Sequence, residues 1–210
     1  MAHAQGQYAE ATDLCVQSLA TVQKLGNRFD EGFPRYFAGK IARDQGRYAE
    51  AADSFARSLI IWKEMGDRLH EEKTLCEFGL LAVKQGQYTN ATTSYTQSLT
   101  IAREIGDQKG TADTSYHMGQ LKEEEGQSSD AEGYYKEALA IYSAIGLPDA
   151  EDVRSALTRL AVFPTTAGPT IPRKRVDQPD ATLPTPPDPS ASDPSPTRQG
   201  FWPWQRQRLL

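Results

Sequence analysis

Apolar residues recur between positions 1 and 163 with the spacing of an α-helix. Between residues 48 and 62 one face would carry Tyr48, Ala51, Ala52, Phe55, Ser58, Leu59 and Trp62. Intervals of three and four residues place side chains on the same side of a helix. The pattern predicts amphipathic helices that each bury one face.

This pattern recurs at every fortieth position of the chain. A first block recurs at Gln5–Ala11, Gln45–Ala51, Gln85–Ala91 and Glu125–Ala131. A second block recurs in phase at Ser18–Asn27, Ser58–Asp67, Ser98–Asp107 and Ala138–Gly146. Two separate blocks in four copies indicate an internal repeat, and each unit is predicted to hold two helices.

Glycines mark the predicted helix ends. Those at positions 46, 86 and 126 suit the turn inside a hairpin, and those at 26, 66, 106 and 146 suit the left-handed residue that closes a helix. Asn27, Asp67 and Asp107 follow directly, where a short polar side chain can cap the next helix. A single hairpin cannot cover its own apolar face, so we expect the hairpins to stack and to form a concave groove.

These units resemble the tetratricopeptide repeat. The second helix of that repeat carries alanine and then an aromatic residue four positions later, as in Ala51/Phe55, Ala91/Tyr95 and Ala131/Tyr135. Its first helix carries an apolar residue and then glycine, as in Ala38-Gly39, Phe78-Gly79 and Met118-Gly119. The resemblance covers residues 5–147 and implies an all-α, tetratricopeptide-like α-solenoid of about three and a half repeats, with a capping helix at 148–162.

The repeat unit is longer than that of the usual tetratricopeptide repeat, which is about 34 residues, and no proline follows the second helix. In this the chain is similar to the longer-repeat branch that includes Leu-Gly-Asn scaffold proteins, kinesin light chains and repeat arms of bacterial ATPase-type regulators. We expect repeat copies near 1–27, 28–67, 68–107 and 108–147.

The composition changes near residue 163. Eleven of the 13 prolines lie between Pro164 and Pro203. The segment 164–210 has almost no apolar residue before Phe201, so it cannot offset the entropy cost of ordering, and we expect a disordered Pro-rich tail. Its PxxP matches fit the pattern that SH3-type domains bind, but such matches are common in any proline-rich tail. Its Phe201–Trp204 end is a candidate anchor to a protein groove or an anionic membrane surface, and a frayed or unselected terminus explains it at least as well.

Counting back one repeat from Gly39 leaves the first unit without a first helix. The opening helix would then expose Tyr8, Ala11, Cys15, Leu19 and Val22. Two explanations stay open: the chain is part of a longer array, or another surface covers this helix, by self-association or by a partner.

The resemblance implies that the first helix of each hairpin lines the groove. The candidate partner-binding residues are Tyr36, Lys40, Arg43, Lys73, Glu77, Lys84, Tyr116, His117 and Gln120. Lys40, Arg43 and Lys73 could pair with an acidic ligand. The alternative is that these residues form only a solvated helix face. The asparagine often used by groove-binding relatives is replaced by Phe37, Glu77 and His117, so no known ligand can be carried over.

Charge and composition exclude several functions. Positions 1–163 carry 17 Lys and Arg against 24 Asp and Glu, which disfavours binding to nucleic acid. No stretch has the roughly 20 apolar residues of a membrane span, and no signal peptide is evident. Cys15 and Cys76 lack the spacing of a metal or redox pair, so we expect no metal or cofactor and a reduced, cytoplasmic setting.

Catalysis has little support. The three histidines are scattered, and the sequence has neither a phosphate-binding loop nor a nucleophile elbow. A Cys76–His117 pair is conceivable on adjacent first helices, but a structural role is favoured. We therefore expect a non-catalytic adaptor that binds a peptide or helix of another protein. The alternative is a sensor arm of an ATPase-type or transcriptional regulator.

Overall fold

The computed structural model describes residues 2–26 and 28–162, with side chains from residue 8 onward. Within this part the chain is helical and has no strand. Its elements are α1 (Ala2–Leu25), the 3₁₀ turn η1 (Arg28–Glu31), α2 (Gly32–Asp44), α3 (Tyr48–Met65), α4 (Arg68–Lys84), α5 (Tyr88–Ile105), α6 (Gln108–Glu124), α7 (Ser128–Ala144) and α8 (Ala150–Val162).

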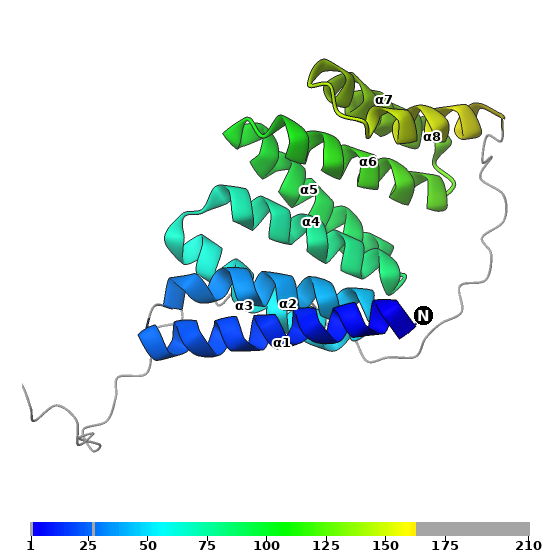
Figure 1. The fold of residues 1–210 in the computed structure, drawn as a ribbon. Coiled ribbons are helices and arrows are strands. Elements are labelled where there is room, and N and C mark those ends of the chain that lie inside the picture. The colour runs from blue at the N-terminus through cyan, green and yellow to red at the C-terminus, as the bar shows by residue number, and fades with distance from the viewer. Residues whose placement is uncertain (1, 27, 163–210) are drawn as a thin grey trace, which may run out of the picture. The chain divides into compact units, whose positions relative to one another are not determined.

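The helices form successive hairpins, α2/α3, α4/α5 and α6/α7 (Figure 1). Each hairpin packs on the next one along the chain, α1 packs against α2, and α8 packs against α7. All of them belong to one compact unit, Met1–Arg173. This arrangement confirms the predicted tetratricopeptide-like α-solenoid. The capping helix begins at Ala150, after a turn over residues 145–149.

The turns follow the sequence pattern. All seven predicted turn glycines have positive φ angles, between 68° and 77°. Asp67 caps α4 by accepting the His70 N–H at 3.0 Å, and Asp107 caps α6 by accepting the Gly110 N–H at 2.9 Å. Each cap satisfies a backbone donor that the helix itself leaves unpaired. The cap predicted at Asn27 lies outside the described residues.

A glycine on each first helix lies against an aromatic ring of the second helix. The pairs are Gly39 with Phe55, Gly79 with Tyr95 and Gly119 with Tyr135. A Cβ atom at Gly39 would lie only 2.6 Å from the Phe55 ring, so no larger residue fits without a shift. The three rings are fully buried and form the core of each hairpin.

Helix α1 is covered less well than the other second helices. Ala51, Phe55, Ser58 and Trp62 of α3 are buried, whereas none of the described α1 side chains is buried. Leu14 is 59% exposed. The apolar face of α1 packs against α2 and η1, and none of the other described helices packs closely on it. The predicted exposure of this face is therefore confirmed in part, because Tyr8, Ala11, Cys15, Leu19 and Val22 are each half-buried.

The predictions for residues 164–210, including the disordered tail and its Phe201–Trp204 end, lie outside the described residues. Among the helices that are described, none is long and apolar enough to cross a membrane.

Candidate partner-binding groove

A hollow of about 570 Å³ runs along the first helices of three successive hairpins. We call it the groove. Its lining comes from α2, from α4, and from α6 with its N-cap: Tyr36, Lys40, Leu69, Glu72, Lys73, Cys76, Glu77, Leu80, Asp107, Lys109, Gly110, Asp113 and His117. Among the described residues, none from a second helix lines it. The constant repeat length causes this, because it brings the same face of every first helix to the same side.

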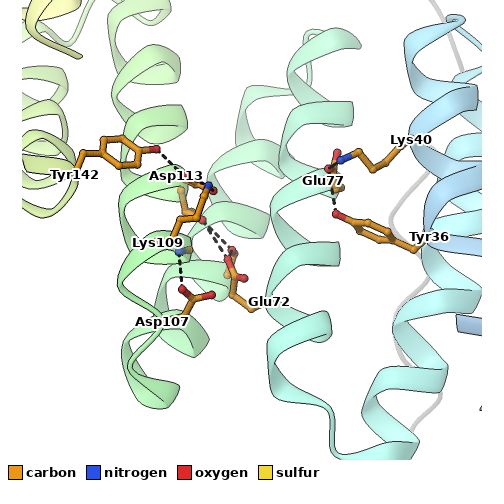
Figure 2. Close-up of polar contacts among 11 residues, drawn as sticks. Tyr36, Lys40, Glu72, Glu77, Asp107, Lys109, Asp113 and Tyr142 are labelled. Atoms are coloured by element: carbon orange, nitrogen blue, oxygen red, sulfur yellow. Dashed lines mark hydrogen bonds and ion pairs between the residues drawn. The ribbon is translucent and has the colours of Figure 1, made fainter. Parts of the chain in front are cut away.

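Glu77 forms the centre of the α2 end of the groove. It is 7% exposed, and its carboxylate lies 3.1 Å from Lys40 Nζ and accepts a hydrogen bond of 3.3 Å from the Tyr36 hydroxyl (Figure 2). Arg43 also forms an ion pair with it. Burial and the Glu77 charge raise the pKa of Tyr36. Burial opposes the charge on Arg43, yet Glu77 and Asp44 raise the pKa of Arg43 above its usual value.

Two of the three cations predicted to bind an acidic ligand are thus already paired inside the protein. Lys40 and Arg43 share Glu77, and Arg43 also contacts Asp44 at 2.8 Å. Lys73 is exposed in the groove wall and forms no ion pair with a described residue. A ligand carboxylate would have to compete with Glu77 for the first two cations but not for Lys73.

Glu72 lies at the α6 end of the groove and was not among the predicted residues. It is 1% exposed, and its Oε1 accepts hydrogen bonds from Ser98 at 2.8 Å and Thr114 at 3.4 Å. Its Oε2 has no hydrogen-bond partner among the described residues. Burial raises the pKa of Glu72 to about 7.

The repeat register held the signal that could have revealed this residue. At the equivalent positions of the preceding and following hairpins, the chain has the small residues Gly32 and Ala112. A carboxylate at a position that is otherwise small and apolar is the exception that marks Glu72.

Charged residues of α6 form the opposite wall. Lys109 Nζ lies 2.7 Å from Asp113 Oδ2, and the Tyr142 hydroxyl donates a hydrogen bond of 2.7 Å to Asp113 Oδ1 (Figure 2). The negative charge of Asp113 is therefore stabilised by the Lys109 ammonium group and by the Tyr142 hydroxyl. Asp107, at the start of α6, forms no ion pair with a described residue.

Of the remaining predicted residues, one lines the groove and the others do not. His117 lines the groove, stacks on Tyr95 with ring centroids 6.1 Å apart, and meets Gln120 Oε1 at 3.2 Å through Nδ1. Burial lowers the pKa of His117. Tyr116, Gln120, Arg43 and Lys84 do not line the groove; Tyr116 packs on Tyr135, and Lys84 is exposed at the end of α4.

The environment of Cys76 and His117 does not favour nucleophilic catalysis. Burial strongly raises the pKa of the Cys76 thiol, which disfavours the reactive thiolate. Burial keeps His117 neutral by lowering its pKa, and its Nδ1 meets Gln120. In the described part of the chain no group of three or more His, Cys, Asp or Glu residues is arranged to hold a metal.

Comparison with known proteins agrees with the geometry. The model of the tetratricopeptide repeat family matches residues 70–144. Residues 70–144 are tetratricopeptide repeats. They span α5, α6 and α7 and all but the first two residues of α4, and therefore contain most of the groove.

A solved structure shares the tetratricopeptide fold over a longer range. The crystal structure of BtubC (BKLC) from P. vanneervenii superimposes with a TM-score of 0.59 at 16% sequence identity. The match covers 76% of this chain and 75% of that chain. No protein of curated function matches the sequence. Tetratricopeptide repeats generally mediate contacts between proteins.

Proposed function

We propose that the chain is a non-catalytic adaptor that holds a peptide or helix of another protein in the groove. The observation that carries the proposal is the lining itself. Side chains of α2, α4 and α6, from three separate hairpins, converge on one hollow of about 570 Å³. Pockets of several hundred Å³ with a few placed polar groups are typical binding sites.

The wall of the groove suits a peptide because it combines apolar and polar contacts. Tyr36, Leu69 and Leu80 offer apolar surface, and Lys73 and Glu72 offer charges without an ion-pair partner among the described residues. A sensor arm of a larger regulator would use the same surface. The adaptor role is therefore a prediction, and the sensor arm is its alternative.

Site-specific photocrosslinking tests the proposal without assuming the charge of the ligand. Peptides are first selected on the full chain from a phage-displayed library of random peptides. The photoreactive residue p-benzoylphenylalanine then replaces Lys73 in one variant and Gln97 in another. Lys73 lies in the groove wall, whereas Gln97 is also exposed but lies on the second helix α5.

We expect the selected peptides to crosslink at position 73 and not at position 97. Crosslinking at position 97 alone, or a library that yields no binding peptide, would contradict the proposed function.

A further inference from the structure

We propose that the groove receives a basic side chain, lysine or arginine, of its partner at Gly110, between the carboxylates of Glu72 and Asp107. This inference rests on the proposed function and adds the chemistry of the ligand. It is carried by two carboxylate oxygens, from different helices, that converge on the bare Cα atom of Gly110.

The geometry is set by the missing side chain of Gly110. A Cβ atom built on this glycine would lie 2.8 Å from Asp107 Oδ2 and 3.1 Å from Glu72 Oε2. Both oxygens therefore approach the same point from different helices. Gly110, Asp107 and Glu72 all line the groove, so this point belongs to its wall.

The preceding hairpin shows which chemistry fits this place. One repeat before Asp107 and Gly110 stand Asp67 and His70. There an imidazole stands at the position of the glycine, and its Nδ1 lies 2.7 Å from Asp67 Oδ2. In the next hairpin the imidazole is replaced by glycine, so the corresponding oxygen of Asp107 has lost its nitrogen partner.

Glu72 adds a second carboxylate to this place. Its Oε2 is buried and has no hydrogen-bond partner among the described residues, although such atoms are nearly always paired in folded proteins. A cation between Glu72 and Asp107 would supply the missing partner of both. The torsion next to a carboxyl group is soft, so the two terminal oxygens can turn toward a group that enters the groove.

The neighbouring charges do not already provide this cation. The groups that face Glu72 are Lys73 on its own helix, Ser98 on α5, and Asp107 and Thr114 from α6. Lys73 forms no ion pair with Glu72, and Lys109, the other basic residue of this wall, is paired with Asp113. Glu72 and Asp107 therefore present a local negative charge to a ligand.

Ligand binding should depend on pH, because a cation favours the ionised form of Glu72. Burial and the Asp107 charge raise the pKa of Glu72 to about 7, whereas Lys73 lowers it. Below that pH the carboxyl must lose its proton when the cation binds. The affinity for a basic peptide should therefore rise roughly tenfold between about pH 6 and pH 8.

Peptides selected on the full chain from the random library serve as probes. The inference predicts that they are enriched in lysine or arginine. Each one is compared with an analogue in which norleucine replaces lysine, or citrulline replaces arginine. We expect the charged peptide to bind the wild-type chain at least about tenfold more tightly than its neutral analogue.

Three variants locate the effect. Glu72→Gln removes the charge and Gly110→His restores the imidazole of the preceding hairpin, and both should reduce the preference for the charged peptide to within about twofold. Glu72→Gln should also abolish the pH dependence. The control Glu132→Gln removes a carboxylate that is exposed on α7 and should bind like the wild type. Circular dichroism establishes that each variant is folded.

Peptides that crosslink at position 73 but show no basic enrichment would overturn this inference and leave the proposed function standing. Equal preference for the charged peptide in the wild type and in Glu72→Gln would do the same.

Discussion

Arg43 on α2 forms an ion pair with Glu77 on α4, so that one buried carboxylate joins the first helices of two successive hairpins. Lys40 shares this carboxylate from the solvent side. The contact means that part of the groove wall is held together by its own charges.

Replacing Arg43 by methionine should destabilise the fold. Glu77 would keep Lys40 as its only basic partner while remaining 7% exposed, so we expect the free energy of unfolding to fall by about 1–3 kcal/mol. Urea denaturation at neutral pH measures this change. Arg57→Met is the control, because Arg57 pairs with Asp53 on an exposed surface and should change stability by less than about 0.5 kcal/mol. Equal effects in the two variants would show that burial of the ion pair has no influence.

Replacing Gly79 by alanine should also destabilise the chain. The added Cβ would overlap the Tyr95 ring, and relief requires a shift of two packed helices, so we expect a loss of about 1–3 kcal/mol. Gly133→Ala on α7 is the matched control, since no atom lies within 4 Å of its added Cβ. That variant should gain roughly 0.5–1 kcal/mol from helix propensity. Thermal and urea unfolding of both variants provide the comparison, and a stabilising Gly79→Ala would refute the close contact.

The stability of the chain should fall with rising pH because of Glu72. The pKa of this residue is about 7 in the folded state and 4.5 as a free side chain. Between these values the unfolded chain has lost a proton that the folded chain retains, so the free energy of unfolding decreases, by about 3 kcal/mol in total. Glu72→Gln should remove this decrease and be more stable than the wild type at pH 8.

Urea titrations at pH 4, 6 and 8 would measure the effect, with Glu132→Gln as a control that keeps the wild-type profile. A wild-type chain and a Glu72→Gln chain with parallel pH profiles would show that Glu72 ionises normally.

The incompletely covered α1 face leads to a prediction about assembly. We expect the chain to self-associate through this face, and Leu14→Lys to suppress the association while leaving the free energy of unfolding nearly unchanged. Leu14 is 59% exposed, whereas its equivalent on α5, Ser94, is 3% exposed. Sedimentation equilibrium over a range of concentrations would detect the change in mass. Val162→Lys is the control, because Val162 is 62% exposed on α8; a monomer at all concentrations would argue against self-association.

Most of the fold could be predicted because it depends on short-range patterns that repeat. The constant repeat length located every hairpin, and the glycines located the turns. The resemblance also selected five residues that line the groove, namely Tyr36, Lys40, Lys73, Glu77 and His117. Hairpins, turns and groove-facing positions all follow from the helix register, and the register can be derived from the spacing of residues in the sequence.

The pairing of charges in the groove could not be predicted in this way. Glu77 meets Arg43 across 34 residues of sequence, and whether it faces a ligand or a neighbouring helix depends on side-chain geometry. The site at Gly110 was missed for a related reason. It is made by an absent side chain and by Glu72, which a helical pattern places on a helix but cannot place against α6.

The contacts between Gly39 and Phe55, Gly79 and Tyr95, and Gly119 and Tyr135 have a consequence for the evolution of such chains. Each contact lies within one hairpin and occupies the same register, so a repeat that is duplicated or deleted as a whole keeps its own core intact. The number of first helices, and with it the length of ligand that the chain can hold, can therefore change through copy number alone. Each copy can then acquire its own ligand preference by substitutions in its first helix. Positions 70 and 110, which are equivalent in two successive repeats and carry histidine and glycine, are an example.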